Sequence, residues 1–148
     1  MTKNLSENRK AHFHYEILET HEAGIELKGF EVKAIKNGHM DLAGTFAVIR
    51  GREIYLLNAN IAPYQAGNVP LDYDPTRSRR LLLKKTEIAE LAAKMKERGL
   101  TLVPLRVYNK GNLVKVELGL ARGKRGPDKR AAIRKREVNR EIERTLKS

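Results

Sequence analysis

The sequence predicts a mainly β fold, a small and partly open barrel with short helices and a basic C-terminal tail. Short apolar runs alternate with polar residues, Asn, Gly and Pro separate them, and two stretches have helical spacing. The length of 148 residues allows one domain, and a hydrophobic fraction of 41% is enough for one core. Barrels of the OB type bind nucleic acid, which makes this fold class informative about function.

The composition divides the chain into three parts. Polar residues dominate at the N-terminus, and we interpret residues 1–10 as a flexible arm. Residues 11–121 carry the apolar pattern of the barrel, and residues 122–148 form the basic tail. One barrel with two extensions therefore accounts for the whole chain.

The first elements of the barrel are predicted to be two strands and one helix. Tyr15–Leu18 and Gly24–Leu27 have strand-like composition, with a break near residues 22–24. In "GFEVKAIKNG", residues 29–38, the apolar residues lie at helical spacing. Asn37-Gly38 is expected to end this helix, because glycine accepts the left-handed conformation found there.

A hairpin and a long loop are expected next. Thr45–Ile49 and Glu53–Leu57 are extended runs that flank Arg50-Gly51-Arg52, a typical hairpin turn. The stretch "NIAPYQAGNVPLDYDPTRSRR" follows, and its prolines exclude a regular element. Its residues Tyr64 and Tyr73 either stack on splayed bases or cap the barrel.

The second helix and the last two strands have the clearest signals. The helix is predicted from Thr86, as its cap, to Arg98, with Gly99 as its stop. The strands "LTLVPLRVY" and "LVKVELGLA" follow, joined through residues 109–112. Alternation of apolar and polar residues in the second strand indicates one buried face.

The charge of the chain points to a polyanionic partner. The formal net charge is +12 and the pI is about 10.1, as in many nucleic-acid-binding proteins. An anionic membrane would also attract such a chain, but no apolar run approaches the roughly 20 residues that span a bilayer. The sequence has no cysteine and no apolar secretion signal, so we expect a cytoplasmic protein without a membrane partner.

The tail carries eleven basic and four acidic residues, a net charge of +7 in less than a fifth of the chain. A solvated, disordered end is the ordinary interpretation of such a run. Against it, Pro127-Asp128 resembles a helix start, and Val138, Ile142 and Leu146 are spaced four residues apart. This apolar seam is narrow, so we expect a tail that is disordered when free and helical when bound to RNA.

Arg77, Arg79 and Arg80 form a basic cluster just before three leucines. In an extended segment, Arg77 and Arg79 would share one face and Arg80 would lie on the other. The planar guanidinium group suits paired phosphate contacts, so we expect phosphate binding here rather than only an exposed basic loop.

Two other classes of protein share this composition. A metal-dependent nuclease would use the four histidines, but no His-x-x-x-His spacing or paired carboxylate motif accompanies them. We therefore expect neither catalysis nor a metal or other cofactor. A ribosomal protein, with its tail fixed between rRNA helices, is also compatible with the composition, and occupancy on ribosomes would distinguish it.

Six segments carry a resemblance to one family. They are "NRKA" from Asn8, "EAGIELKGFEVKAIKNG" from Glu22, "NIAPYQAGN" from Asn60, "DPTRSRRLLLKKTEI" from Asp74, "TLVPLRVY" from Thr101 and "KVELGLARGKRGPDKR" from Lys115. In this order they resemble the tmRNA-binding small protein B family, the SsrA-binding proteins of bacterial trans-translation.

The resemblance implies an OB-like barrel that binds the tRNA-like domain of tmRNA. It implies delivery of alanyl-tmRNA to ribosomes stalled without a codon, where the barrel replaces the missing anticodon arm. The tail would lie in the empty mRNA channel near the decoding centre and its small-subunit rRNA. Elongation factor Tu with GTP would be an indirect partner through alanyl-tmRNA, and we expect a monomer.

The resemblance also assigns site residues. Glu22 matches an RNA-face glutamate of the family, and Leu82 lies in its "RKLLL" stretch. From the residues alone, Glu22 is a surface turn residue, an acceptor for base edges or 2′-hydroxyls, or a partner that holds an arginine in place. Leu82 is either a core residue or an apolar contact to an unstacked base. The expected tmRNA-binding residues are Asn8, Arg9, Lys10, Glu22, Lys33, Arg77, Arg79, Arg80 and Leu82. The expected ribosome-binding residues are Gly123, Lys124, Arg125, Asp128, Lys129, Arg130, Arg134, Lys135 and Arg136.

Two positions depart from the family's pattern. Pro127 stands where the family usually has Tyr or His before "DKR". We therefore expect this tail to lack an aromatic stack on a decoding-centre base, a contact of about 1–3 kcal/mol. His14 stands in place of the acid in the family's "HDY", so that acid is absent here.

Overall fold

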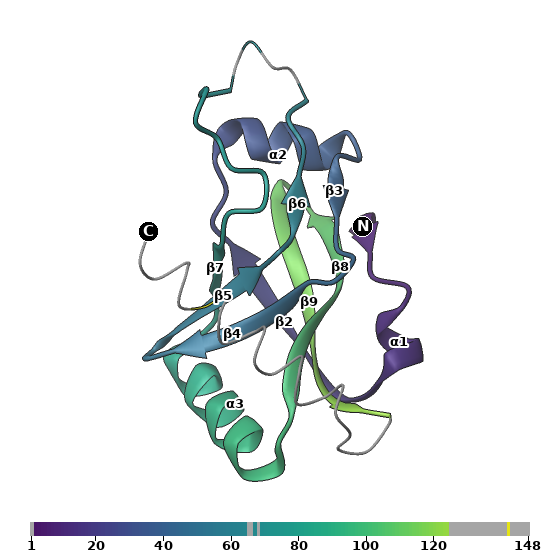
Figure 1. Ribbon diagram of the computed structural model, residues 1–148, viewed down its shortest axis with the longest axis vertical. Coiled ribbons are helices and arrows are strands. Elements are labelled where there is room, and N and C mark those ends of the chain that lie inside the picture. The colour runs from purple at the N-terminus through teal and green to yellow at the C-terminus, as the bar shows by residue number, and fades with distance from the viewer. Residues whose placement is uncertain (1, 65–66, 68, 125–141, 143–148) are drawn as a thin grey trace.

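The computed structural model describes residues 2–64, 67, 69–124 and 142, and in these residues the fold is mainly β (Figure 1). Three short helices accompany the strands in this described part. In chain order the elements are β1 (Thr2–Glu7), α1 (Ala11–His14), β2 (Tyr15–Ile25), α2 (Gly29–Lys36), β3 (Met40–Asp41), β4 (Phe46–Arg50), β5 (Glu53–Leu57), β6 (Asn60–Ile61), β7 (Arg79–Leu82), α3 (Lys85–Arg98), β8 (Thr101–Lys110) and β9 (Leu113–Gly123).

The strand pairings of the large sheet form a closed circuit. They run from β8 through β4, β5, β7, β2 and β9 and return to β8, and every pairing is antiparallel. β4 and β8 meet at a single pair, Ala47 with Leu102. β1 pairs with β8 outside the circuit, and β3 and β6 form a separate two-stranded sheet. A closed circuit leaves few strand edges open to pairing with another chain.

Apolar side chains fill the interior of this circuit. Inward-facing strand residues such as Leu56, Leu102 and Leu118 are fully buried. Ile35 of α2 and Leu91 of α3 join the same core. Figure 1 shows α2 and α3 at opposite ends of the strands, so each helix covers one end of the core.

Local turn signals placed several element boundaries correctly. α2 ends at Lys36, and Gly38 beyond it has φ +82°. Gly51 in the β4–β5 turn and Gly99 after α3 have φ +62° and +64°, the left-handed region that glycine accepts without strain. The predicted start of α3 is corrected slightly: the helix begins at Lys85, so Thr86 lies inside it and does not cap it.

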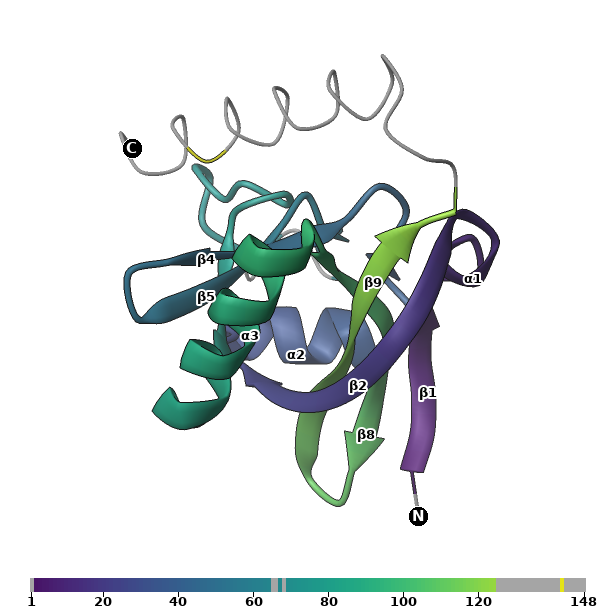
Figure 2. The same ribbon diagram turned by 90° about the horizontal axis from the view of Figure 1, so that it is seen from below.

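The N-terminal residues are not a separate flexible arm as expected. Thr2–Glu7 form β1, which pairs with β8 (Figure 2). The Ser6 hydroxyl donates to the Met40 carbonyl at 3.1 Å, and the Asn8 N–H donates to the Leu105 carbonyl at 2.9 Å. The polar composition of this segment did not indicate a strand, because a strand at the edge of β8 needs backbone pairing more than apolar side chains.

The strand break expected near residues 22–24 is also wrong. β2 runs without interruption from Tyr15 to Ile25 and pairs with β9 along most of its length. A register shift between Ile17 and Glu19 is the irregularity in this pairing. Ala23-Gly24 therefore lies within the strand, and the small residues leave room for the neighbouring strand instead of forming a turn.

The prediction that the tail is disordered when free and helical when bound to RNA concerns mainly residues 125–141 and 143–148, which lie outside the described residues. Ile142 is described, and its side chain is buried against Val48 and Leu57 of the β4–β5 hairpin. β9 extends past the expected boundary at residue 121, because it reaches Gly123, and the Lys124 N–H donates to the His14 carbonyl at 3.1 Å.

Candidate nucleic-acid interface

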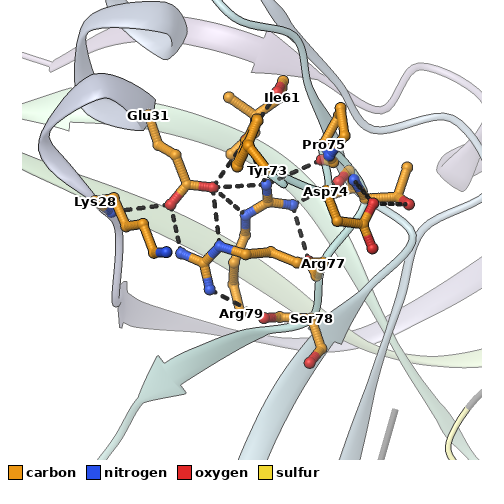
Figure 3. Close-up of polar contacts among 11 residues, drawn as sticks. Lys28, Glu31, Ile61, Tyr73, Asp74, Pro75, Arg77, Ser78 and Arg79 are labelled. Atoms are coloured by element: carbon orange, nitrogen blue, oxygen red, sulfur yellow. Dashed lines mark hydrogen bonds and ion pairs between the residues drawn. The ribbon is translucent and has the colours of Figure 1, made fainter. Parts of the chain in front are cut away.

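A buried ionic network ties the long loop to α2 (Figure 3). Glu31 of α2 and Arg79 of β7 are both fully buried. Arg79 Nη2 lies 2.7 Å and Nε 3.0 Å from Glu31 Oε2. Arg77 also donates to Glu31 from Nε and Nη2, and the Tyr73 hydroxyl lies 3.0 Å from Oε2. Arg77 and Arg79 therefore share one face, as expected of an extended segment.

Arg79 is corrected from a phosphate contact to a structural residue. Its other nitrogen, Nη1, lies 2.6 Å from the Ala59 carbonyl, and Nη2 also donates to the Pro75 carbonyl at 2.9 Å. All three guanidinium nitrogens donate within the protein, and the side chain has no exposed surface. Arg79 holds the loop that ends in β7 and has no surface from which to contact RNA.

The network keeps Glu31 ionised to unusually low pH. Burial alone would raise the pKa of the Glu31 carboxyl, but hydrogen bonds from Arg77, the Lys28 backbone and Arg79 outweigh it and lower the pKa to about 2. Burial also raises the pKa of Tyr73 to about 12, so its hydroxyl stays protonated. The charges of the network are therefore fixed across the physiological pH range.

The free energy of unfolding should decrease as the pH is lowered, because of Glu31. Its carboxyl has an ordinary pKa of 4.5 and a folded value of about 2, so its contribution is complete above pH 4.5 and is lost as pH falls toward 2. Urea denaturation between pH 2.5 and pH 6 measures this loss. The Glu31→Gln variant should lack this part of the pH dependence, and identical profiles for the two proteins would contradict the assignment.

Expected contact residues from β2 and β7 lie along the outer face of the sheet, on either side of one residue pair. Gly24 pairs directly with Leu82, and a Cβ atom at Gly24 would lie 3.2 Å from the Leu82 Cβ. Leu82 is 45% exposed while Leu81 is buried, so Leu82 is not the core residue of the first interpretation. Glu22 and Arg80 lie on the same face, each two residues from this pair but in opposite directions along the strands, since Arg80 lies beside Glu26, whose N–H donates to the Arg80 carbonyl at 2.9 Å. We call Glu22, Gly24, Arg80 and Leu82 the outer-face cluster.

Glu22 is held by two donors from β8. The Tyr108 hydroxyl donates to Glu22 Oε2, and Lys110 Nζ lies 3.2 Å from Oε1. The hydrogen bond from Tyr108, and after it that from Lys110, lowers the pKa of the Glu22 carboxyl. The Glu22 side chain is nevertheless 40% exposed, so an oriented carboxylate faces the solvent.

Other expected contact residues lie away from this cluster. The Asn8 side chain donates to the Pro104 carbonyl at 2.9 Å and thereby helps to fix the end of β1 on β8. Arg9, Lys10 and Lys33 are exposed, as are Gly123 and Lys124 at the end of β9. The remaining expected tail residues, Arg125, Asp128, Lys129, Arg130, Arg134, Lys135 and Arg136, lie outside the described residues.

Sequence reasoning did not single out Glu31, Arg106, Tyr108 or Lys110. Alternation within β8 would have placed the last three on one face, which is a usable signal. The Arg106 guanidinium carbon lies 4.2 Å from the centre of the Tyr108 ring, a stacked arrangement that no sequence pattern specifies. Glu31 pairs with arginines 46 and 48 residues away, and nothing local marks that pairing.

The described residues contain no group of three or more His, Cys, Asp or Glu side chains placed to hold a metal ion. Among the same residues, no helix combines the length and the apolar character needed to span a bilayer. A closed circuit of antiparallel strands, with polar and apolar side chains side by side on its outer face, defines a small β domain.

Comparison with known proteins identifies the family. The SmpB protein family matches residues 5–148, and the chain belongs to that family. The SsrA-binding protein of Carboxydothermus hydrogenoformans is 51% identical over 148 residues, which cover 100% of this chain and 99% of that protein. The SsrA-binding protein of Thermosynechococcus vestitus is 51% identical over 145 residues, covering 98% of this chain and 95% of that protein.

A solved structure supports the same conclusion about the fold. A chain from the structure titled "tmRNA-SmpB: a journey to the center of the bacterial ribosome" has 52% sequence identity and a TM-score of 0.68. The match covers 83% of this chain and 86% of that chain. The mainly β architecture is therefore shared with a member of the family at high sequence identity.

Proposed function

We propose that the chain binds the tRNA-like domain of tmRNA and acts with it in trans-translation, the rescue of ribosomes stalled without a codon. The observation that carries this function is family membership over residues 5–148. The name of the relatives, SsrA-binding protein, and the net charge of +12 agree with an RNA partner.

The described domain is the part of the chain proposed to bind tmRNA. The closed circuit of strands is interpreted as the OB-like barrel, a fold that binds nucleic acid on its outer surface. The outer-face cluster offers a cation at Arg80, an exposed apolar side chain at Leu82 and an acceptor at Glu22. These three kinds of contact suit phosphate, a base face and a hydrogen-bond donor of RNA.

The tail is proposed to act on the ribosome, in the empty mRNA channel near the decoding centre. Its net charge of +7 suits a channel lined by rRNA. Elongation factor Tu with GTP is proposed as an indirect partner through alanyl-tmRNA. We further propose that the protein works as a cytoplasmic monomer, and that it contributes binding rather than catalysis of its own.

Equilibrium binding to tmRNA tests the proposed function. The purified chain would be titrated with labelled tmRNA at physiological salt in the presence of excess ordinary tRNA. Binding that survives the competitor is the expected result, because recognition of specific features adds to the general attraction of a basic protein for RNA. If tRNA displaced tmRNA in proportion to its concentration, the charge alone would account for the affinity and the proposal would fail.

Replacing Arg80 should weaken RNA binding and reduce its salt dependence. The Arg80 side chain is 45% exposed, and its contacts to Glu26 and Glu53 are long, at 3.7 and 3.8 Å. The slope of log K against log salt should fall by about one for Arg80→Gln, for one lost phosphate contact. Arg98→Gln, at the exposed end of α3, removes the same charge and serves as the control. Equal slopes for the two variants would exclude a specific phosphate contact at Arg80.

A further inference from the structure

Tyr108 combines a buried ring with a hydroxyl that reaches an exposed carboxylate. The residue is 3% exposed, and the Arg106 guanidinium group lies over its ring at 4.2 Å. Arg106 is itself held by Glu117 at 3.3 Å and by the Asn4 side chain at 2.7 Å. The position of the Tyr108 hydroxyl is therefore fixed by side chains from β1, β8 and β9. Its hydrogen bond to Glu22 spans β9 and connects β8 to β2.

The two donors leave Glu22 able to accept a further hydrogen bond. An ionised carboxylate has about four lone-pair sites, and Tyr108 and Lys110 do not occupy all of them. Because both donors favour the charged form, Glu22 presents acceptors and no donor at neutral pH. A fixed acceptor loses little side-chain entropy when it binds, which favours affinity for a matching donor.

The location of Glu22 limits what it can recognise. A phosphate group would be repelled by the carboxylate, whereas hydrogen-bond donors of RNA would be attracted. Leu82 lies on the neighbouring strand opposite Gly24, two residues from Glu22, and is 45% exposed. An apolar side chain next to an oriented acceptor suits a nucleoside, which has an apolar face and donor groups, better than it suits the RNA backbone charge.

We propose that Tyr108 and Lys110 are positioning residues that hold Glu22 as a specificity-determining acceptor for a donor group of RNA, either a 2′-hydroxyl or an amino group of an unpaired base. This inference rests on the proposed function, since the RNA in question is tmRNA. Its consequence is a division of labour within the outer-face cluster. Arg80 contributes affinity for any RNA, and Glu22 contributes discrimination between tmRNA and other RNA.

The Tyr108→Phe variant tests the positioning role, because it removes one hydroxyl and keeps the ring under Arg106. The ratio of affinities for tmRNA and tRNA should fall by about fivefold, the effect of one hydrogen bond of about 1 kcal/mol. Glu22→Gln should lower the ratio at least as much, and adding Tyr108→Phe to it should change the ratio by less than about twofold. NMR titration of the free protein should show the pKa of Glu22 rising toward its ordinary value in Tyr108→Phe.

Tyr55→Phe is the matched control. The Tyr55 hydroxyl donates to Glu53 on β5 in the same kind of tyrosine–glutamate hydrogen bond. This variant should leave the affinity ratio unchanged. Lys110→Met should lower the ratio in the same direction as Tyr108→Phe. A second set of titrations, with 2′-deoxy nucleotides or with bases lacking the amino group at single positions of the tRNA-like domain, identifies the donor.

The outcomes separate this inference from the proposed function. One outcome is that the wild-type protein retains tmRNA in the presence of competitor tRNA while Tyr108→Phe shows the same ratio of affinities as the wild type. In that case the positioning role is wrong and the proposed function stands. Additive effects of Glu22→Gln and Tyr108→Phe would also overturn the inference. The inference would also be wrong if no nucleotide substitution reproduced the fall in the affinity ratio seen in Glu22→Gln. If the wild-type protein itself does not prefer tmRNA, both fail.

Discussion

The Glu31→Ala variant is expected to be less stable than the wild-type protein by about 3–5 kcal/mol. Arg79 would keep its hydrogen bonds to carbonyl groups but would lose the carboxylate that neutralises its charge. Its side chain is fully buried, so water would solvate the unpaired charge less well than the carboxylate of Glu31 does. Since domains of this size have about 5–15 kcal/mol of stability, this loss would leave the protein marginally folded.

Urea denaturation of the two proteins measures this difference. Glu19→Ala is the matched control, because Glu19 pairs with Lys94 at 3.0 Å while both side chains are about one third exposed. That change should cost no more than about 1 kcal/mol, as is usual for exposed ion pairs. Equal losses in the two variants would mean that the Glu31 network stabilises the fold no more than a surface pair does.

The Glu31 network shows which part of the fold the sequence could not predict. The helix at residues 29–36 follows from apolar spacing and a glycine stop, both contained in ten residues. The partners of Glu31 on the loop and β7 are set by how distant elements pack together. A buried arginine and an exposed one have the same local sequence signal, which is why Arg79 was expected to bind phosphate together with Arg77 and Arg80.

Some strands were predicted correctly and others were missed for the same reason: a local signal marks the first kind, and only distant pairing marks the second. The hairpin at Gly51 has a turn residue between two apolar runs, so both of its strands could be placed. β1 has no such signal, because its polar residues join the sheet through backbone pairing with a strand about 100 positions later. Propensity favours a disordered arm there, and the available edge of β8 overrides it.

The candidate site was predictable only in part. The resemblance located Glu22 and Leu82, but not the pairing of Gly24 with Leu82 that brings them together. The residues that orient Glu22 come from β8, across the intervening strand β9. A linear motif can indicate which residue contacts a ligand, while the residues that hold it in place depend on sheet order and register.

Sheet register also defines where the tail can be removed without loss of strand pairing. β9 pairs with β2 up to Gly123, and the backbone of Lys124 is bonded to His14. A chain that ends at Lys124 keeps all of these contacts. It loses the charges proposed to act on the ribosome, and it loses Ile142, whose burial against Val48 and Leu57 stabilises the hairpin.

Truncation after Lys124 should spare tmRNA binding and abolish tagging on stalled ribosomes. The proposed tmRNA contacts of β2 and β7 remain, so affinity should change mainly through the lost general charge, and it should approach the wild-type value as the salt concentration is raised. Tagging should fall to background, because the deleted segment is the one proposed to occupy the mRNA channel. A reconstituted translation reaction on an mRNA without a stop codon measures tagging, and filter binding measures affinity.

Ile142→Ala in the full-length chain separates packing from function. Removing its buried side chain should destabilise the domain by about 2–4 kcal/mol, because the contacts of Ile142 with Val48 and Leu57 are lost. Tagging at a temperature where this variant remains folded should stay near the wild-type rate, since the basic residues of the tail are all present.

A truncated protein that loses tmRNA while its domain stays folded would instead place part of the tmRNA contact in the tail, and the two-part division of the chain would be wrong.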